Sequence, residues 1–596
     1  MKRRLKCILP LLILLPASLM SAAEKDVTDF AVEKVRFEGN QQIKAKQLRS
    51  AMITRPSTLL NKNPYRPQLL KEDMQYVERY YKDRGFLQAK VIGYDVRIDT
   101  SATDVFITVQ VEEGNRTFVR SVEFEGNTVF SDERLARVLK LSPGDPLLQL
   151  RIDDGMVAML ADYADNGYVH ANVEERVTVD SSAREADVKL IFEEGAQYFV
   201  DSVRVKGLEI TQPFVVRREI RLEPGDSLNY SRMLRSQREL YRTGLFQSVF
   251  IKYQPPQSRR GDTKDIIVEL EEMDPIELQL TAGYGSVVQV RGGAEIAHRN
   301  LLRRGLTARL RTEGSTIGYR IESSLTLPWT FGYDWASSVS GLQEYRIEPN
   351  YDYRSTGGKY SLTHDFSMDI RLAGNYQMEY TELLKVKTQE PPEDINTNTR
   401  RVEAALTIDK RNDLFNPTMG WYFDARQELV GYYLGGTNDF VKVVHEWKWY
   451  HTIQSGTVIA TRIEAGWADS PYGLIDIPLN ERFYAGGPYS VRGYSLQGIG
   501  PRDSEGVVVG GRAKLVWNVL ELRQTIWRWI GTAAFFDIGQ VWAKSHRLTN
   551  QSLLTSPGIG LRVNTPVGLV RVDAAVPSHE MRFKKIKLWF GVGQTF

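Results

Sequence analysis

Asp369-Ile-Arg-Leu-Ala-Gly-Asn-Tyr-Gln-Met-Glu-Tyr-Thr381 alternates between two kinds of side chain for thirteen residues. From Ile370 to Tyr380 the even-numbered positions hold apolar or aromatic residues and one glycine, whereas the odd-numbered positions are mostly polar or charged. Successive side chains of a β-strand point to opposite faces, so this stretch predicts a strand with one apolar face. Its length and the aromatic residues near one end favour a lipid-facing strand over a strand of a soluble sandwich.

The alternation continues through the C-terminal half of the chain. Residues 458–467 repeat it, and the aromatic clusters at 421–423 and 447–450 would form girdles at the membrane interfaces. The region 276–596 holds 321 residues. A strand with its turn takes roughly 20 residues, which predicts about 16 antiparallel strands. We therefore expect an all-β transmembrane β-barrel at 276–596, with a soluble β-sandwich as the alternative.

The N-terminal half contains three copies of one unit. Each copy opens with an alternating strand that ends at a glycine: Gly39, Gly126 and Gly207. A helical middle follows, and its second helix stops at another glycine, which supplies a left-handed cap. A repeat of this length predicts an array of α+β modules, each with the order strand–helix–helix–strand–strand. We expect these modules at 24–115, 116–196 and 197–275.

Each module closes with a strand that runs into two adjacent glutamates. The pairs are Glu112-Glu113, Glu193-Glu194 and Glu271-Glu272. Paired carboxylates can perform acid–base catalysis, but these recur in every copy without a base or metal ligand nearby in the sequence. We therefore expect them to be solvated turn residues.

The first residues have the pattern of a signal peptide. A basic stretch at 2–6 precedes an apolar run at 8–19, and small residues at 21–23 offer a cleavage site. We expect a signal peptide at 1–23 and therefore an exported protein. Cys7, the only cysteine, lies within this segment, so the mature chain would have no disulfide and no thiolate metal site.

Composition excludes several classes of protein. Charged residues make up 25% of the chain and hydrophobic residues 42%, which excludes intrinsic disorder. The formal net charge of +3 gives no general electrostatic reason to bind nucleic acid. The seven histidines form no zinc-binding pattern, and serine-hydrolase and phosphate-loop motifs are absent from the sequence. We expect no enzyme activity, no catalytic residues, no cofactor and no metal.

The stretch Arg482-Phe-Tyr-Ala-Gly-Gly-Pro-Tyr-Ser-Val-Arg-Gly-Tyr494 is the most specific motif in the chain. Its glycines and proline would break strand pairing and allow a tight reversal. If the loop folds back into the barrel, Arg492 enters a confined lumen, where a guanidinium needs carboxylate partners.

The motifs together resemble one family. The three modules resemble the POTRA domain, and Val491-Arg492-Gly493-Tyr494 resembles the loop-6 motif of the BamA/TamA-type outer-membrane insertases and transporters. The segments 518–522 and 535–539 resemble two strands of that superfamily. The resemblance implies that Glu521 and Asp537 are the inward-pointing partners of Arg492. The end of the chain resembles the strand by which such barrels are recognised for assembly, through Leu588, Phe590, Val592 and Phe596.

The resemblance also implies a function. The protein would insert β-barrel or autotransporter proteins into the cell outer membrane, with its modules in the periplasm. A lateral seam between the first and last strands would open and template incoming strands. Glycines on those strands would weaken the seam: Gly283, Gly285, Gly591 and Gly593. Three modules suit the TamA branch, which implies a TamB-like inner-membrane-anchored partner, contact with membrane lipid, and unfolded outer-membrane substrates.

Two other functions compete with this one. A two-partner secretion pore would export a soluble passenger through its lumen, and a passive porin would conduct solutes. The porin leaves the array of modules unexplained, and residues 24–31 are too few for the plug helix that the secretion class usually carries.

Overall fold

The computed structural model describes residues 30–57, 62–256, 261–388, 395–471, 477–527, 529–545, 553–566, 568–580 and 585–596. The predicted signal peptide at 1–23 lies outside the described residues. Two compact units divide the chain, one comprising 1–163 and 170–195 and the other 164–169 and 196–596. In the described part, helices that are both long and apolar enough to cross a membrane do not occur.

The first unit contains two modules with the predicted order of elements. Their elements are β1 (Ala31–Glu38), α1 (Ala45–Ala51), α2 (Pro67–Lys82), β2 (Lys90–Asp99), β3 (Asp104–Glu112), β4 (Phe118–Glu125), α3 (Asp132–Leu139), α4 (Gln149–Asp165), β5 (Asn172–Asp180) and β6 (Glu185–Glu193). In each module the third strand lies between the other two and runs parallel to the first. The helices pack on one face of this small sheet, with Leu70, Val77 and Val105 buried in the first core.

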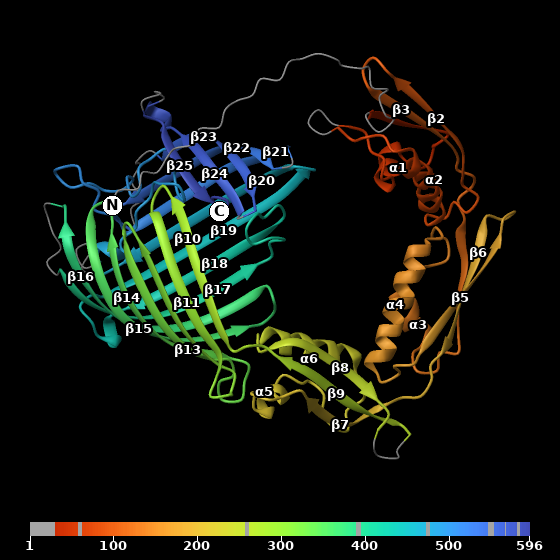
Figure 1. Cartoon of the computed structure of the whole chain (residues 1–596), viewed down its shortest axis with the longest axis horizontal. Helices are drawn as coiled ribbons and strands as arrows, with labels where there is room; N and C mark the ends of the chain where they lie inside the picture. The colour runs from red at the N-terminus through yellow and green to blue at the C-terminus, as the bar shows by residue number, and fades with distance from the viewer. Residues whose placement is uncertain are drawn as a thin grey trace, which may run out of the picture. The chain divides into compact units, whose positions relative to one another are not determined.

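The second unit begins with the third module. Its elements are β7 (Phe199–Lys206), α5 (Pro213–Arg217), α6 (Tyr230–Arg242), β8 (Phe246–Gln254) and β9 (Thr263–Glu272), again with the third strand in the middle. The three modules confirm the predicted α+β repeat (Figure 1).

The expectation that the closing glutamates are solvated is wrong for the second glutamate of each pair. Glu113 is buried and accepts hydrogen bonds from the backbone N–H groups of Gln42 (2.8 Å) and Ile43 (3.1 Å) and from the Tyr81 hydroxyl (2.8 Å). Its carboxylate therefore accepts hydrogen bonds from backbone N–H groups of the loop that precedes the first helix, where the backbone has no strand partner.

The same bridge recurs in the other two modules. Glu194 accepts from the backbone N–H of Val129 (2.9 Å), the Tyr163 hydroxyl (2.7 Å) and the Thr128 hydroxyl. Glu272 accepts from three consecutive backbone N–H groups at 209–211. Burial raises the pKa of both carboxyls, but these hydrogen bonds outweigh it and hold each pKa below its usual range.

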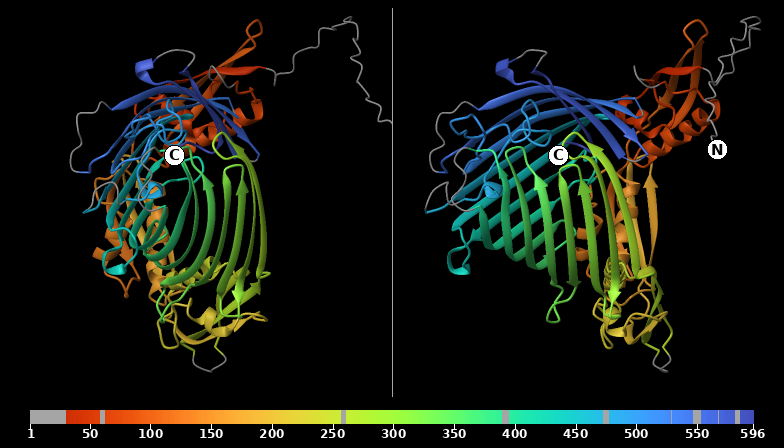
Figure 2. Two further views of the ribbon diagram at one scale, coloured as in Figure 1. Left: turned by 90° about the vertical axis from the view of Figure 1, so that its left-hand side faces the viewer. Right: turned by 60° about the vertical axis from the view of Figure 1, so that its left-hand side comes forward.

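The rest of the second unit is the predicted barrel, in which the described residues form one sheet of sixteen strands, each antiparallel to the next. The strands are β10 (Ile276–Gly285), β11 (Gln289–Leu301), β12 (Leu306–Ser315), β13 (Gly318–Leu327), β14 (Ala336–Ile347), β15 (Tyr351–Asp365), β16 (Ile370–Val386), β17 (Asn396–Asp409), β18 (Gly420–Val430), β19 (Phe440–Gln454), β20 (Thr457–Asp469), β21 (Ala513–Trp527), β22 (Ile530–Trp542), β23 (Leu554–Thr565), β24 (Gly568–Ala575) and β25 (Lys587–Val592). Figure 2 shows them as one continuous tilted wall from green β10 to blue β25.

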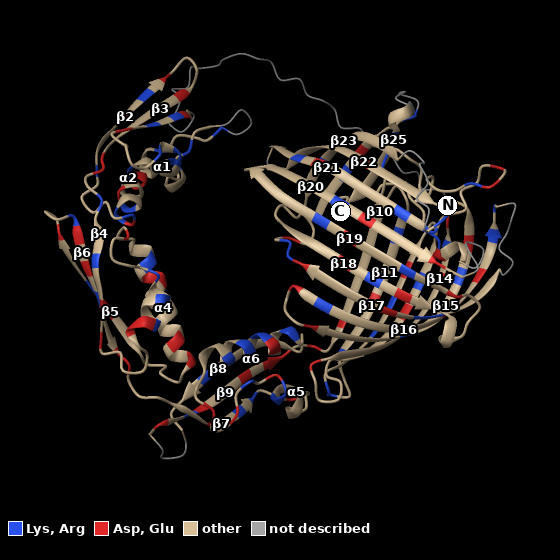
Figure 3. Cartoon of the chain, turned by 180° about the vertical axis from the view of Figure 1, so that it is seen from behind, with Lys and Arg blue, Asp and Glu red and all other residues tan. Residues whose placement is uncertain are grey.

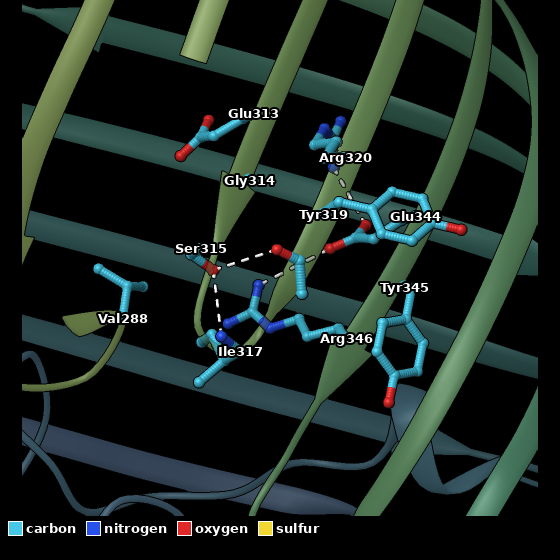
Figure 4. Close-up of a pocket in the computed structure, with 11 residues that line it drawn as sticks. Val288, Glu313, Gly314, Ser315, Ile317, Tyr319, Arg320, Glu344, Tyr345 and Arg346 are labelled. Atoms are coloured by element: carbon cyan, nitrogen blue, oxygen red, sulfur yellow. Dashed lines mark hydrogen bonds and ion pairs between the residues drawn. The ribbon is translucent and has the colours of Figure 1, made fainter. Parts of the chain in front are cut away.

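Side chains alternate across this wall as the sequence predicts. Met378 and Tyr380 on β16 are exposed on the outer face, whereas Asn375 is buried on the inner face and donates to Glu403 (2.5 Å). Inner charges pair across strands. For example, at the ends of β13 and β14, Glu344 lies between Arg320 (3.3 Å) and Arg346 (3.9 Å), as Figure 4 shows.

Part of the lumen is filled by the segment between β20 and β21, of which residues 470–471 and 477–512 are described. We call this segment the inner loop. Phe483 and Val491 of the loop are buried against Val516 of β21 and Val541 of β22. Short bridges between Phe483 and Gly511, and between Ala485 and Ile499, fold the loop on itself.

Candidate functional site

Arg492 lies at the inner end of the loop and is fully buried. Its Nε and Nη2 donate to the two oxygens of Asp537, both at 2.8 Å, and its Nη1 donates to Glu521 at 2.7 Å. Glu521 projects from β21 and Asp537 from β22, so the structure brings together the three residues that the sequence singled out. A bidentate fork on one carboxylate and a single bond to another use the planar geometry that only arginine offers.

Neighbouring groups hold the guanidinium in place. The ring of Phe535 lies beneath it, with its centroid 3.2 Å from the guanidinium carbon, and Asn518 donates to Asp537 at 2.8 Å. The indole nitrogen of Trp589 on β25 donates to the Arg492 carbonyl at 2.6 Å.

The residues on either side of Arg492 fit their surroundings closely. A Cβ on Gly493 would lie 2.4 Å from the Ser556 hydroxyl and 2.8 Å from the backbone of Val576, so a glycine is required there. Val491 is fully buried, and the Tyr494 ring stacks on His579 at 6.1 Å.

A third acid, which the sequence reasoning did not assign to Arg492, completes the cluster. Asp573 on β24 lies 3.7 Å from Arg492 and pairs with Arg562 (2.6 Å) and Arg571 (3.1 Å). Its signal was present in the sequence, since β24 places charged residues opposite Val570 and Val572 in a lipid-type alternation. Every carboxylate of the cluster has an arginine partner, and groups of acids and histidines able to hold a metal are absent from the described residues.

A second anchor, also missed from the sequence, holds the other end of the inner loop. Glu481 is buried, contacts both terminal nitrogens of Arg401 on β17, and accepts from Lys442 on β19 at 2.7 Å. Arg401 also pairs with Glu428 of β18 (2.9 Å) and Glu379 of β16 (3.5 Å). The loop thus contributes an acid, Glu481, to one cluster of charges on the barrel wall and a base, Arg492, to another.

The last four residues lie elsewhere than the sequence suggested. The final strand ends at Val592, and Gly593, at φ +87°, turns the chain into the lumen. The Thr595 hydroxyl accepts from Arg492 (3.3 Å) and from Arg571. Phe596 is buried beside Tyr450, and its carbonyl accepts from Arg523 (3.1 Å). Gly593 therefore lies past the seam strand, and Phe596 is separate from the outer face.

The outer face of β25 carries the other three residues of the predicted assembly signal. Leu588 and Val592 are exposed, and Phe590 packs against Tyr284 of β10 with the ring centroids 5.7 Å apart. Gly591 faces inward beneath Arg571, and a Cβ there would lie 3.3 Å from the arginine Nε.

The seam between β10 and β25 is joined at one end. Ser286, just past β10, donates its backbone N–H (3.1 Å) and its hydroxyl (3.0 Å) to the Phe590 carbonyl, and the Phe590 N–H donates back to the hydroxyl at 3.1 Å. Among the described residues, β10 and β25 share no strand ladder, although every other pair of neighbours does. Gly283 and Gly285 lie on this free edge, and a Cβ at Gly283 would lie 2.9 Å from the Arg291 side chain.

Comparison with known proteins agrees with this architecture. Residues 300–596 match the Omp85 superfamily domain, and residues 30–114, 117–195 and 198–273 match the POTRA family, described as a surface antigen variable number repeat. The outer membrane protein assembly factor BamA of Nitratidesulfovibrio vulgaris (strain Hildenborough) is 26% identical over 95% of this chain and 73% of its own length. BamA of Neisseria meningitidis serogroup B is 24% identical over 93% of this chain and 73% of its own.

A solved structure shares the fold. The crystal structure of BamA from Haemophilus ducreyi lacking POTRA domains 1–3 superposes with a TM-score of 0.64 at 20% identity. It covers 80% of this chain and 99% of that one. The chain therefore belongs to the Omp85 superfamily, in the BamA/TamA-type group that joins POTRA modules to a sixteen-stranded barrel.

Proposed function

We propose that this protein inserts β-barrel or autotransporter proteins into the outer membrane by templating their strands at the seam between β10 and β25. Its family places the barrel in the outer membrane and the modules in the periplasm. The relatives named above are outer membrane protein assembly factors. Assembly of outer-membrane proteins is therefore the general activity, and the seam supplies the mechanism that we add to it.

The free edge of β10 is the observation that carries this mechanism. β10 has ten residues and β25 has six, and their hydrogen bonds in the described structure involve Ser286 and Phe590. Apart from the Ile276 N–H, which donates to Asp274 at 2.9 Å, the other N–H and C=O groups along that edge have no strand partner among the described residues and can pair with an incoming strand. An unpaired strand edge in a membrane is unstable, because lipid offers it no hydrogen bonds.

The Arg492 cluster ties together the strands on the C-terminal side of this seam. Glu521, Asp537 and Asp573 come from three strands of the C-terminal wall, and one guanidinium contacts all three. Removing one partner of a buried charge cluster costs about 3–5 kcal/mol. We infer that this cluster keeps the C-terminal wall in shape while the seam parts.

The modules would deliver the substrates. In each small sheet the first and second strands lie at the edges, so an extended peptide can add a strand there with little sequence specificity. A TamB-like inner-membrane-anchored protein would dock on the same modules.

Covalent closure of the seam tests the mechanism. Because Ser286 lies opposite Phe590, antiparallel register places Gly285 opposite Gly591, both on the inner face. Gly285→Cys combined with Gly591→Cys should therefore form a disulfide across the seam. Other thiols should not interfere, because Cys7 in the predicted signal peptide is the only native cysteine. Oxidation should stop substrate assembly and reduction should restore it.

The matched control is Thr281→Cys with Gly591→Cys, which is four residues out of register and should neither crosslink nor change activity. Heat-modifiable mobility on gels reports that each barrel remains folded. Full assembly by a completely crosslinked barrel would rule out opening of the seam as the mechanism. A secretion pore that exports through its lumen would be indifferent to the same crosslink, so the test also separates the two functions.

A further inference from the structure

A cleft of about 620 Å³ lies between helix α6 of the third module and two barrel turns, 328–335 and 366–369. Both sides belong to the same compact unit. Direct contacts hold them together. The indole nitrogen of Trp329 donates to Glu219 at 2.7 Å, and Arg242 of α6 pairs with Asp365 at 3.3 Å. The cleft is therefore held in place by direct contacts between the module and the barrel.

Arginines dominate the polar lining. Five face the cleft: Arg221, Arg235, Arg238, Arg242 and Arg371. The four acids of the lining are already paired, namely Glu219 with Arg218, Glu239 with Arg242, Asp365 with Arg371, and Asp334 with His364 and Arg221. Figure 3 shows the basic residues along α6.

Two guanidinium groups have no partner of their own. Arg235 and Arg238 form no ion pair with any described residue, whereas Arg221 pairs with Asp334 through Nη2 and only its buried Nε has no acceptor there. One wall of the cleft therefore presents uncommitted donors that suit a phosphate, which arginine binds through its fork of N–H groups.

The opposite side of the cleft combines polar residues with exposed apolar side chains. Phe366 is 61% exposed and Met368 is 87% exposed, and Phe331 on the neighbouring turn is 92% exposed. These turns join strands whose outer faces are apolar, so they lie where the bilayer meets water at the periplasmic end of the barrel. Soluble surfaces rarely leave such side chains together in water.

We propose that this cleft binds the headgroup of an anionic phospholipid from the periplasmic leaflet of the outer membrane. The phosphate would lie against Arg235 and Arg238, and the acyl chains would cover Phe366 and Met368. A soluble acidic peptide would satisfy the arginines but would leave the apolar turns exposed, which is why a lipid fits better. The site would fix the third module against the membrane, and it does not depend on strand templating at the seam.

Lipid retention by the full-length protein tests the site. The protein would be reconstituted in nanodiscs of phosphatidylglycerol and phosphatidylcholine, and the retained lipids counted by native mass spectrometry. Phosphatidylglycerol should be retained in preference to phosphatidylcholine. Arg235→Gln with Arg238→Gln should weaken that retention roughly thirty-fold, as expected for two basic groups at an anionic surface.

The matched control is Arg217→Gln with Arg232→Gln, which removes the same charge from exposed arginines of the same module outside the cleft. This variant should retain phosphatidylglycerol like the wild type. Arg235→Lys with Arg238→Lys should retain an intermediate amount. Heat-modifiable mobility should be unchanged in all variants, because all four substituted side chains are exposed.

Two competitors identify the ligand class. Millimolar inorganic phosphate should leave the bound lipid in place, because phosphate lacks the acyl chains. Displacement by phosphate would mean a site for free anions, and displacement by an acidic unfolded peptide would mean a peptide site. Either result, or equal retention by the Arg235/Arg238 variant and its control, would overturn the proposal.

Discussion

At the scale of single residues, the guanidinium group of Arg492 pairs with three carboxylates on three different strands. Arg492→Ala should leave Glu521 and Asp537 buried without their main counter-charge, which costs about 3–5 kcal/mol. We expect assembly activity to fall by at least tenfold while the protein still reaches the membrane. Arg492→Lys should also fall short, because an ammonium cannot reproduce the fork.

The control for these variants is Arg502→Ala, since Arg502 is an exposed arginine of the same loop that binds only backbone carbonyls of the described residues. Substrate assembly measures the activity of each variant, and heat-modifiable mobility on gels reports whether its barrel is folded. An Arg492→Ala protein with the activity of the Arg502→Ala protein would show that the cluster is dispensable.

Glu481 offers a second prediction at the same scale. Glu481→Gln should leave Arg401 and Lys442 short of one negative charge in a buried site. We expect the outer part of the inner loop to loosen, and protease cleavage near the exposed Arg502 to become faster than in the wild type. Arg492 would still hold the other end, so the barrel should remain folded. Cleavage at the wild-type rate would mean that the second anchor contributes little.

At the scale of elements, the second closing glutamate of each module stabilises the loop before the first helix. The pKa of Glu194 is lowered in the folded chain, so its contribution is complete above the unfolded pKa of about 4.3 and is lost as pH falls through the folded value. Hydrogen exchange at residues 128–131, corrected for intrinsic rates, should be slow at neutral pH and speed up in acid.

Glu194→Gln should show the faster exchange already at neutral pH and lose about 1 kcal/mol of local stability, because an amide accepts these bonds more weakly. Glu193→Gln is the matched control, because the carboxylate of Glu194, and not that of Glu193, makes the loop contacts. Equal exchange in the two variants would contradict this role of Glu194.

The elements also show what local patterns can and cannot predict. Alternation in β16 and the glycine-capped helices depend on near neighbours, so the strands and modules were predictable. The inward turn at Gly593 was not, because it depends on Arg523 and Tyr450, which are far away in the sequence. Glu194 was misjudged for the same reason: the loop that needs its carboxylate lies more than sixty residues upstream.

At the scale of the whole molecule, family membership and strand number followed from the motifs and from length. The incomplete seam did not follow, because the four glycines indicate weak packing without showing which edge lacks a partner. Two of those glycines, Gly283 and Gly285, lie on the free edge of β10, whereas Gly593 serves the inward turn.

The central claim is that this free edge pairs directly with a substrate strand. Cysteines introduced at Leu278, Leu280 and Thr281 of β10 can be tested against cysteines along the last strand of a substrate stalled during assembly. The control is Leu310→Cys on β12, which is exposed on the outer face but has strand partners on both sides. The account predicts disulfides at β10 in a single register, with yield lost when either cysteine moves by one residue, and none at Leu310. Normal assembly without any crosslink to β10, or with equal yield at Leu310, would contradict it.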